Sequence, residues 1–500
     1  MEKLTSTSSV VQMVDIWSIF ALAIIVLLVT KYLMNGTLSP PGPWGLPFIG
    51  HLLFLGKDHA KQFQRYREEF GDVYQLRLGV WPTVIISGYH TVKKVLSEQS
   101  DSFAARPAFN SFKFINKMRG LTFSYFDQRY LLHRKIASTV LKEYSSRMEE
   151  IMQEEANRIV SDFLNENGRP FNPNKVVTEA TGSIIYQFCY GKGENIREDK
   201  DFLELLENHK NFKEMAKAAN PTDVLPWTQI FFQEKVRKFH KFIRKAQHSR
   251  AEKFQDILET FDPKHMRHAV DGIISTSIRY GLEDEPNEVG LTKHDVFTLT
   301  GDFFGGGFDN TSTTLCWLLL YMAEYPVVQA TIQREIDNVI GQKGIILLED
   351  REKMPFTEAT IFETMRLSGV VPLGLPHCAT EDVLVNRYII KKGTLVFFNH
   401  YSVGHDKEWG DPFEFRPERF LDSGGKLMRE KTESVLAFSI GRRRCPGETL
   451  ARNELFLLFA TVLCKCDISK PEHENYNFEG NFSLTYSPKP YNIYVCSKEI

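Results

Sequence analysis

The sequence predicts a mainly α-helical protein with a few small β-sheets, behind one N-terminal transmembrane helix. From about residue 90 to 370 the pattern is mostly helical with polar loops. Strand-like runs are confined to 71–88, 383–400 and 480–498. Helices that dominate over a few short strands favour a single α-rich domain over a doubly wound sheet.

The composition is that of a folded protein whose charge suggests no polyanionic partner. The chain has 500 residues, a formal net charge of −2, 42% hydrophobic and 25% charged residues. These values describe an ordinary globular protein, and without a basic excess we expect no nucleic-acid partner. The 38 phenylalanines suit an interior that receives apolar ligands, although a plain core explains them equally well.

The cysteines support neither a disulfide framework nor a zinc site. Seven of them are present and none forms a C-x-x-C pair. An odd count without such spacing indicates reduced thiols, and therefore a chain whose bulk faces the cytosol.

The N-terminal segment "DIWSIFALAIIVLLVTKYLM" predicts a membrane anchor. Residues 16–34 are about long enough to cross a bilayer as one helix, with Lys31 reaching back to the headgroups. No small-residue cleavage site follows, and lysines and arginines are in excess on the C-terminal side. The positive-inside rule then makes residues 1–15 a short lumenal N-terminus and places the rest in the cytosol. The alternative is a buried core helix.

A stiff connector follows the anchor over residues 35–50. Its core, "SPPGPWGLPFIG", has four prolines and three glycines, which exclude a helix. We expect it to join the anchor to one folded domain over residues 51–500. Within that domain, "GDVYQLRLGVWPTVIISG" predicts two short strands, and residues 295–326 predict one long helix that Pro326 ends.

The most informative stretch is "FSIGRRRCPGETLARNELFLLFATVL", which places Cys445 between a basic, glycine-rich loop and an apolar helix. A thiolate at neutral pH needs positive potential, which Arg442, Arg443, Arg444 and the start of a helix supply. Gly441 and Gly447 let backbone approach a large flat group. These features suit a haem bound through sulfur, with Arg443 at a propionate. The alternative is a buried thiol beside a solvated basic loop.

The spacing F-x-x-G-x-R-x-C-x-G, complete as Phe438, Gly441, Arg443, Cys445 and Gly447, resembles the cytochrome P450 family of haem-thiolate monooxygenases in its microsomal animal form. The resemblance covers nearly the whole chain and implies the cytochrome P450 fold. It makes residues 51–500 the haem-thiolate catalytic domain, with haem b (iron protoporphyrin IX) as cofactor and Cys445 as ligand of the iron.

Further residues match the family pattern with two departures. Arg134 matches an arginine that faces a haem propionate, while Tyr130 stands where the family has tryptophan; His377 aligns with another propionate contact. Glu363, Arg366 and Arg419 match a buried charged cluster that supports the cysteine loop, a structural role. Gly306 belongs to a glycine run, Gly305–Gly307, in the predicted helix. Close approach of a ring plane or dioxygen would explain the run, and tight helix–helix packing is the alternative.

The second departure concerns proton delivery. The family pairs an acid with a threonine that relays protons, which is general acid catalysis through water. Here Asp309 is followed by Asn310, which hydrogen-bonds but does not ionise. Thr311 comes next, but one residue along a helix turns the side chain by about 100°. Either Asn310 orders water itself, or oxygen reduction couples less well to product, or the chemistry needs no dioxygen.

The resemblance implies a monooxygenase that inserts one oxygen atom from O2 into a lipophilic small molecule such as a steroid, fatty acid or xenobiotic. Electrons come from NADPH through NADPH–cytochrome P450 reductase, a separate flavoprotein, with cytochrome b5 as a second donor. The expected location is the endoplasmic reticulum membrane, single-pass, with the catalytic domain cytosolic. The alternatives are a haem-thiolate isomerase or dehydratase that needs neither O2 nor NADPH, and a non-catalytic haem-binding protein.

Three further expectations concern the pocket, the membrane and the redox partner. Phenylalanines between 103 and 126 line an apolar pocket or form ordinary core. Residues 221–232, "PTDVLPWTQIFF", dip into the membrane. A basic face made by Lys135, Lys142, Arg442, Arg443 and Arg444 receives the acidic reductase.

Overall fold

The computed structural model describes residues 18–19, 22, 38–193, 195–217, 221–281, 291–341 and 344–498. The expected lumenal segment 1–15 and all but three residues of the expected anchor 16–34 lie outside this set. Within the described residues, no single helix has the length and apolar character to cross a bilayer. One pair of helices joined at a 107° bend, Lys293–Glu324 with Pro326–Ile340, meets those two criteria together.

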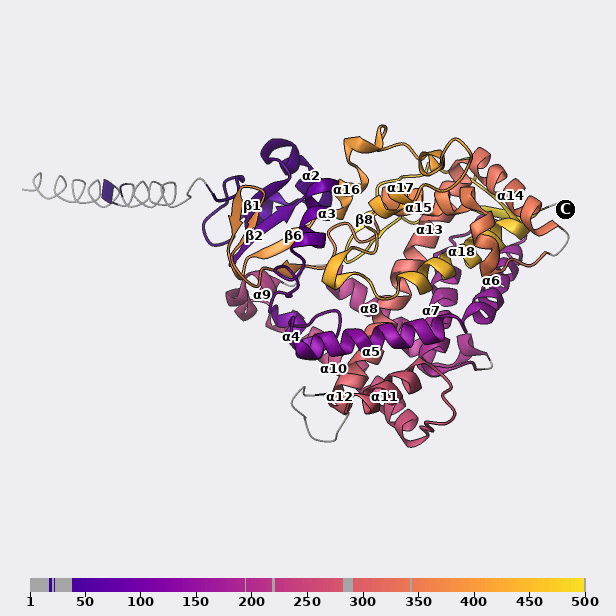
Figure 1. Cartoon of the computed structure of the whole chain (residues 1–500), viewed down its shortest axis with the longest axis horizontal. Coiled ribbons are helices and arrows are strands. Elements are labelled where there is room, and N and C mark those ends of the chain that lie inside the picture. The colour runs from indigo at the N-terminus through magenta and orange to yellow at the C-terminus, as the bar shows by residue number, and fades with distance from the viewer. Residues whose placement is uncertain are drawn as a thin grey trace, which may run out of the picture.

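Helices make up most of the molecule, as the sequence predicts (Figure 1). The α-helices are α2 (His59–Phe70), α3 (Tyr89–Glu98), α4 (Asn110–Asn116), α5 (Gln128–Ser145), α6 (Glu149–Leu164), α7 (Asn174–Tyr190), α8 (Lys200–Lys217), α9 (Pro221–Val224), α10 (Gln233–Glu259), α11 (Ala269–Arg279), α12 (Lys293–Gly307), α13 (Asp309–Glu324), α14 (Pro326–Ile340), α15 (Pro355–Ser368), α16 (His400–Gly404), α17 (Arg429–Ser434) and α18 (Glu448–Lys465).

The largest sheet has four strands in the order β1-β2-β6-β3, formed by β1 (Val73–Leu78), β2 (Trp81–Ile86), β6 (Leu395–Phe398) and β3 (His377–Cys378). β1 and β2 form an antiparallel hairpin, as residues 71–88 predict, and β2 pairs in parallel with β6. The two-stranded sheets are β4 (Val383–Val385) with β5 (Tyr388–Ile390), β7 (Cys466–Ser469) with β10 (Tyr494–Ser497), and β8 (Asn481–Phe482) with β9 (Tyr486–Ser487).

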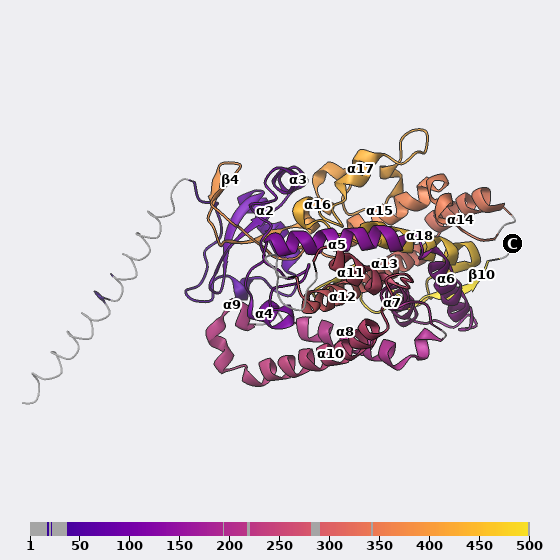
Figure 2. The same cartoon turned by 60° about the horizontal axis from the view of Figure 1, so that its bottom comes forward.

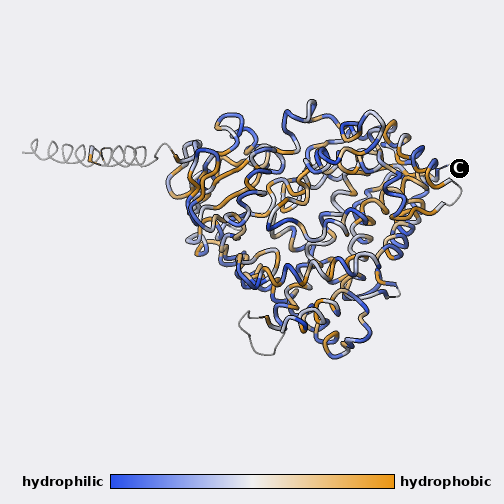
Figure 3. Tube along the Cα trace, in the orientation of Figure 1, coloured by the Kyte–Doolittle hydropathy of each residue, from blue (hydrophilic) through white to orange (hydrophobic). Residues whose placement is uncertain are grey.

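The main hydrophobic core surrounds α13, whose residues 311–323 are all buried. Trp317 is among the largest fully buried side chains, and its indole N–H donates to the carbonyl of Tyr486 in β9 (2.9 Å). A helix that is apolar on every face belongs in the middle of a large core. Figure 3 shows hydrophobic stretches along the four-stranded sheet as well, where two smaller core clusters lie.

The expected connector is held against the folded domain. Residues 38–50 contain no helix, and the carbonyls of Leu38 and Pro41 accept hydrogen bonds from Ile389 in β5 and Gln75 in β1 (2.8 and 2.7 Å). Gly42 packs so closely on β1 that a Cβ there would lie 2.0 Å from the carbonyl oxygen of Gln75. The chain therefore enters the domain in a fixed position beside the four-stranded sheet.

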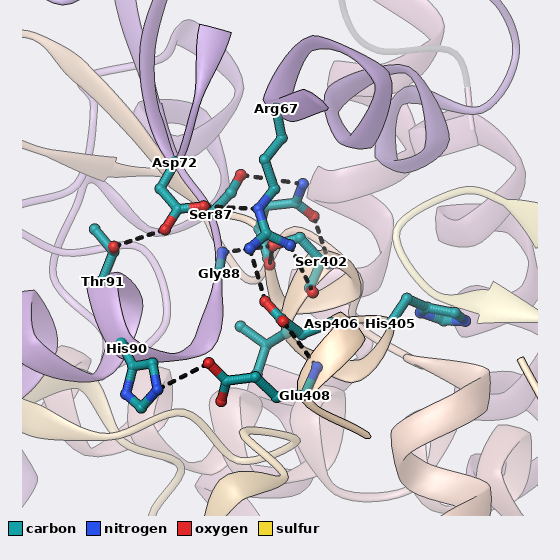
Figure 4. A network of polar contacts seen from close by, with 12 residues as sticks. Arg67, Asp72, Ser87, Gly88, His90, Thr91, Ser402, His405, Asp406 and Glu408 are labelled. Carbon is teal, nitrogen blue, oxygen red and sulfur yellow. Dashed lines mark hydrogen bonds and ion pairs between the residues drawn. The ribbon is translucent and has the colours of Figure 1, made fainter. Parts of the chain in front are cut away.

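A polar network fastens α2 to the sheet and to the loop after α16 (Figure 4). Arg67 of α2 binds Asp72 and Asp406, each at 2.7 Å. Asp72 also accepts from the hydroxyl of Thr91 in α3, and Ser402 of α16 accepts from the Gly88 N–H. Because Asp406 is almost fully buried, this guanidinium neutralises a charge that has no access to solvent.

The predicted helix 295–326 is broken in the middle. α12 ends at Gly307 and α13 begins at Asp309, with Phe308 between them at φ −112° and ψ −35°. Three consecutive glycines weaken the helix at this point, and the Thr311 hydroxyl donates to the Gly307 carbonyl (3.4 Å). Pro326 ends the segment as predicted, and it also begins α14.

Candidate functional site

One large cavity, of about 550 Å³, lies between α5, α12, α13, α15 and the loop that precedes α18. Its lining is mostly apolar. The residues around it come from distant parts of the sequence and include Cys445 together with the glycine run of α12. A mostly apolar cavity with a few convergent polar groups is the usual form of a small-molecule site.

The cysteine loop has a backbone that requires glycine. A short 3₁₀ turn spans Gly441–Arg443, and the Cys445 N–H donates to the carbonyl of Phe438 (2.9 Å). Gly441 has φ +78°, and a Cβ there would lie 2.3 Å from the carbonyl oxygen of Leu96 in α3. Phe438 and Gly447 line the cavity. The spacing of the motif therefore serves to fold the loop tightly against α3.

The Cys445 thiol has its free surface toward the cavity. Cys445 counts as an exposed residue, and the surface that it exposes forms part of the cavity wall. Burial has the largest effect and leaves the pKa of Cys445 above its ordinary value, although the Gly447 N–H and the charges of Arg134 and Arg444 act in the opposite direction. All seven cysteines are free thiols, and Cys445 is the one that lines this cavity.

Three of the arginines that line the cavity lie near the cysteine loop and have no carboxylate partner among the described residues. In the described part of the chain, no ion pair joins Arg106, Arg134 or Arg443 to an acidic side chain. Burial lowers the pKa of Arg106 well below its usual value and that of Arg443 to about 10. Buried cations without counter-ions are costly, so this cluster favours a ligand that carries negative charge.

Arg443 is also a structural residue. Its guanidinium donates to the carbonyls of Ala104, Leu121 and Ser124 at 2.7–3.0 Å and lies 3.7 Å from the centroid of the Tyr130 ring. Arg443 thus lies inside the protein, and does not contribute to the basic outer face expected from the sequence. On that face, Arg442 and Arg444 pair with Asp101 and Glu448.

Tyr130 and His377 join the same region. The Tyr130 hydroxyl donates to the carbonyl of Arg442 (2.8 Å), which links α5 to the cysteine loop. His377 Nδ1 lies 2.6 Å from the carbonyl oxygen of Phe103. Burial, followed by the charge of Arg106, lowers the pKa of His377 well below its usual value. The side chain of Arg134, by contrast, makes no hydrogen bond or ion pair to any described residue, and it lines the cavity.

These groups fit a haem. A thiol faces a large apolar cavity, and three cationic side chains without counter-ions lie on the same side as the cysteine loop. Haem b has a flat apolar ring and two carboxylates at one edge, so its propionates supply the negative charge that the arginines lack.

The cluster Glu363, Arg366 and Arg419 is buried and fully bonded. Arg366 binds Glu363 in a bidentate manner (2.7 and 2.9 Å), and Arg419 binds the same carboxylate (2.9 Å). Arg366 also donates to the carbonyls of Gly404 and Pro412. The cluster joins α15 to the segment 404–419, and none of its three members contacts the cysteine loop by a hydrogen bond that the structure shows.

The glycines of α12 have different environments. A Cβ on Gly305 or Gly306 would meet no atom within 4 Å, and both residues are exposed to the cavity. A Cβ on Gly307 would instead lie 2.2 Å from Ile185 Cγ1 in α7. Helix packing therefore explains Gly307, whereas Gly305 and Gly306 leave open space along the cavity wall.

Asp309 is held by two residues of α8. Its carboxylate lies 2.6 Å from Lys213 Nζ and 3.4 Å from His209 Nε2, and it accepts from the Thr485 hydroxyl (3.2 Å). Burial raises the pKa of Asp309, but His209 and Lys213 outweigh burial and lower it to about 2. The carboxyl is therefore ionised at neutral pH.

Asn310 and Thr311 differ in their access to the cavity. Asn310 is exposed toward the cavity, and its side-chain amide makes no hydrogen bond to the described residues. Thr311 is buried, and its hydroxyl donates to the Gly307 carbonyl. Of the two, Asn310 has the polar group that is free to bind water or a ligand.

Sequence reasoning missed Arg106, Lys213 and His209. Arg106 lies in "RPAF", outside every motif used above, and a lone arginine carries no signal of a propionate contact. Lys213 and His209 lie one helical turn apart on α8, and the one available signal was this i, i+4 spacing.

Comparison with known proteins agrees with this geometry. Residues 40–495 match the model of the family described as Cytochrome P450. The chain is 34% identical over 489 residues to cytochrome P450 1A1 of Rattus norvegicus, covering 93% of this chain and 91% of that protein. It is 32% identical over 478 residues to cytochrome P450 1B1 of Mus musculus (92% and 88%), and 33% identical over 458 residues to cytochrome P450 1A1 of Homo sapiens (87% and 88%).

Proposed function

The chain belongs to the cytochrome P450 family of haem-thiolate monooxygenases, and from this membership we propose that it inserts one oxygen atom of O2 into a lipophilic small molecule with electrons from NADPH. The observation that carries the proposal is the shared cavity. Cys445, the uncompensated arginines and the open glycine segment of α12 all line it.

The cofactor in this proposal is haem b, bound through Cys445. When bound, it supplies the iron centre at which dioxygen is activated. Arg106, Arg134 and Arg443 would hold the propionates, with His377 beside them, and Phe438 would pack against the haem. Tyr130 positions the cysteine loop through its bond to the Arg442 carbonyl. Glu363, Arg366 and Arg419 keep the surrounding fold rigid.

Proton delivery in this proposal uses Asp309, Asn310 and Thr311. Asp309 stays ionised beside Lys213 and His209, so in this proposal its carboxylate accepts a hydrogen bond from water and orients the water chain that carries the proton. The Asn310 amide is free to order that water in the cavity. The Thr311 hydroxyl joins the two sides of the helix break through its bond to the Gly307 carbonyl.

The proposed location is the endoplasmic reticulum membrane, with the catalytic domain in the cytosol and the anchor at residues 16–34. An exposed apolar surface supports membrane contact. It comprises the side chains of Trp44, Phe48, Leu53, Trp227, Ile230 and Phe231. These side chains come from two segments, residues 44–53 and 227–231, which both lie near the turn between β1 and β2. In that turn the Gly79 N–H donates to the Ile49 carbonyl, and the Val80 N–H donates to the Val224 carbonyl. This surface adjoins the connector, so it lies where the chain leaves the proposed anchor.

The proposed electron donor is NADPH–cytochrome P450 reductase, with cytochrome b5 as a second donor. Lys135, Lys142, Arg442 and Arg444 form the basic side of the cysteine loop and of α5, and such a surface suits an acidic partner. The outward ion pairs of Arg442 and Arg444 are exposed, so a partner's carboxylates can exchange with Asp101 and Glu448 at little cost.

Reconstitution tests this function. The full chain, loaded with haem, is combined with reductase, NADPH and a lipophilic probe under isotopically labelled O2. The proposal predicts product that contains one labelled oxygen atom and requires both NADPH and reductase. Product formed from a lipid peroxide without NADPH or O2 identifies instead an isomerase or dehydratase, the alternative that the Asn310 substitution motivates. Ligand binding without any product identifies a non-catalytic haem protein.

A further inference from the structure

An arginine on the far helix of the cavity forms no ion pair with any acidic side chain that the structure describes. Arg250 of α10 lines the cavity, and its Nε donates to the carbonyl of Ala246 in its own helix (3.2 Å). Its guanidinium lies 5.4 Å from the centroid of the Phe297 ring. Among the residues that the structure describes, its terminal nitrogens have no hydrogen-bond acceptor and no ion-pair partner. Figure 2 shows α10 at the bottom of the molecule beside α8 and far from α18, the helix that follows the cysteine loop.

Arg250 lies against α12, close to the glycine segment. A Cβ on Gly301 would lie 2.2 Å from Arg250 Nη1, so the absence of a side chain at 301 gives the guanidinium its place. Gly301 precedes Gly305 and Gly306 by four and five residues, which is about 6–8 Å along a helix. A group bound to Arg250 is therefore held about one to two helical turns from the open glycine segment, within the same cavity.

The neighbouring acid does not neutralise this arginine. Asp302 accepts the Leu121 N–H (2.6 Å), and Thr122 also donates to it, so its carboxyl is occupied by the loop 121–122. Burial raises the pKa of Asp302 and lowers the pKa of Arg250. Arg106, Arg134 and Arg443 are assigned above to the haem, which leaves Arg250 as a separate cation.

We propose that Arg250 is a specificity-determining residue that binds the carboxylate of an otherwise apolar substrate. Guanidinium and carboxylate match as two parallel hydrogen bonds, which are strongest where water is excluded. The walls beside Arg250 are apolar and aromatic, with Phe242, Ile243, Phe297 and Phe304 lining the cavity, and they suit a hydrocarbon body. This inference rests on the proposed function, because it assigns the substrate class of the same cavity.

Paired ligands test the proposal. Dodecanoic acid and 1-dodecanol have the same chain length and differ in charge at neutral pH. Binding to the haem-loaded full chain is measured by calorimetry and by the shift of the haem spectrum. We expect the acid to bind the wild type more tightly than the alcohol, and Arg250→Gln to weaken acid binding by roughly 10- to 100-fold with little effect on the alcohol.

Two variants make the test specific. Arg250→Lys retains the charge and should recover part of the acid affinity. Arg244→Gln removes an exposed arginine of the same helix, which lies over the Phe114 ring, and should leave both affinities unchanged. Equal affinity of the wild type for the acid and the alcohol overturns the proposal, and this measurement does not depend on a variant that folds. An equal loss of affinity for the acid and the alcohol in Arg250→Gln also overturns it.

The failure of this inference differs from a failure of the proposed function. If the alcohol is oxidised with NADPH and the acid does not bind, the monooxygenase function is supported and the role of Arg250 is refuted. If the acid binds through Arg250 but no labelled oxygen enters any product, the binding role stands and the proposed function falls.

Discussion

The carboxylate of Asp309 lies 2.6 Å from the ammonium nitrogen of Lys213, a residue of another helix and 96 positions earlier in the chain. The pair is largely buried, and His209 and Thr485 complete the surroundings of the carboxylate. It ties α8 to the first turn of α13, directly beside the helix break at Phe308.

Replacing Lys213 should make the protein less stable to acid. The folded-state pKa of Asp309, about 2, lies below its ordinary 3.8, so its ionisation stabilises the fold above about pH 4, and this contribution is lost as the pH falls toward 2. Lys213→Met raises that pKa and should move the acid transition to higher pH, at a cost of about 2 kcal/mol at neutral pH. Acid unfolding followed by circular dichroism measures this.

Lys238→Met is the matched control, because Lys238 makes an exposed pair with Glu234. It should leave the acid transition in place. An acid transition that is the same in Lys213→Met and the wild type would show that the pair contributes nothing to stability.

Asn310→Thr should raise the amount of product formed per NADPH consumed. A threonine hydroxyl in place of the free amide restores the acid–alcohol pair of the family pattern. Asn310→Ala, which removes both hydrogen-bonding groups, should lower the ratio. Product and NADPH are measured together in the reconstituted system, and a lower ratio in Asn310→Thr would mean that the amide itself is the better relay.

Gly441→Ala should displace the cysteine loop. The position combines φ +78° with a carbonyl oxygen 2.3 Å from the new Cβ. The left-handed conformation alone costs about 1–2 kcal/mol, and the clash adds to it. Gly425→Ala separates the two effects, because Gly425 has φ +75° but open space around it.

Thermal unfolding and haem content measure both glycine variants. Gly441→Ala should lose haem, whereas Gly425→Ala should keep it and lose only modest stability. Equal behaviour of the two variants would contradict the requirement for close packing against Leu96.

Glu363→Gln should destabilise the protein strongly. It leaves Arg366 and Arg419 buried without their common counter-ion, and breaking a buried pair costs about 3–5 kcal/mol. Glu433→Gln breaks the exposed pair with Arg429 and should change little. Chemical denaturation of both variants is the comparison, and a small effect at Glu363 would contradict the structural role.

The sequence predicts those parts of the molecule that are determined by residues close together in the chain. The hairpin of β1 and β2, the α-rich fold and the motif around Cys445 all follow from local patterns and from the family resemblance. The helix break at Phe308 was missed, because glycines inside a helix lower its stability without fixing whether or where the helix breaks.

Contacts between distant residues were beyond sequence reasoning. Lys213 and Asp309 lie on two helices, and no pattern in the sequence predicts how these helices pack against each other. Arg443 illustrates the same limit, since its motif indicates a cofactor contact but not the carbonyls of Ala104, Leu121 and Ser124 that hold its guanidinium inside the protein. Its neighbour Arg106 has no motif at all.

The most direct test of the account is the reduced, carbon monoxide-bound spectrum of the haem-loaded chain and of Cys445→Ser, with Cys464→Ser as the control for loss of a thiol. Thiolate ligation shifts the Soret band to long wavelength. The account predicts this band in the wild type and in Cys464→Ser, and its loss in Cys445→Ser. A Cys445→Ser protein that keeps the long-wavelength band would contradict it.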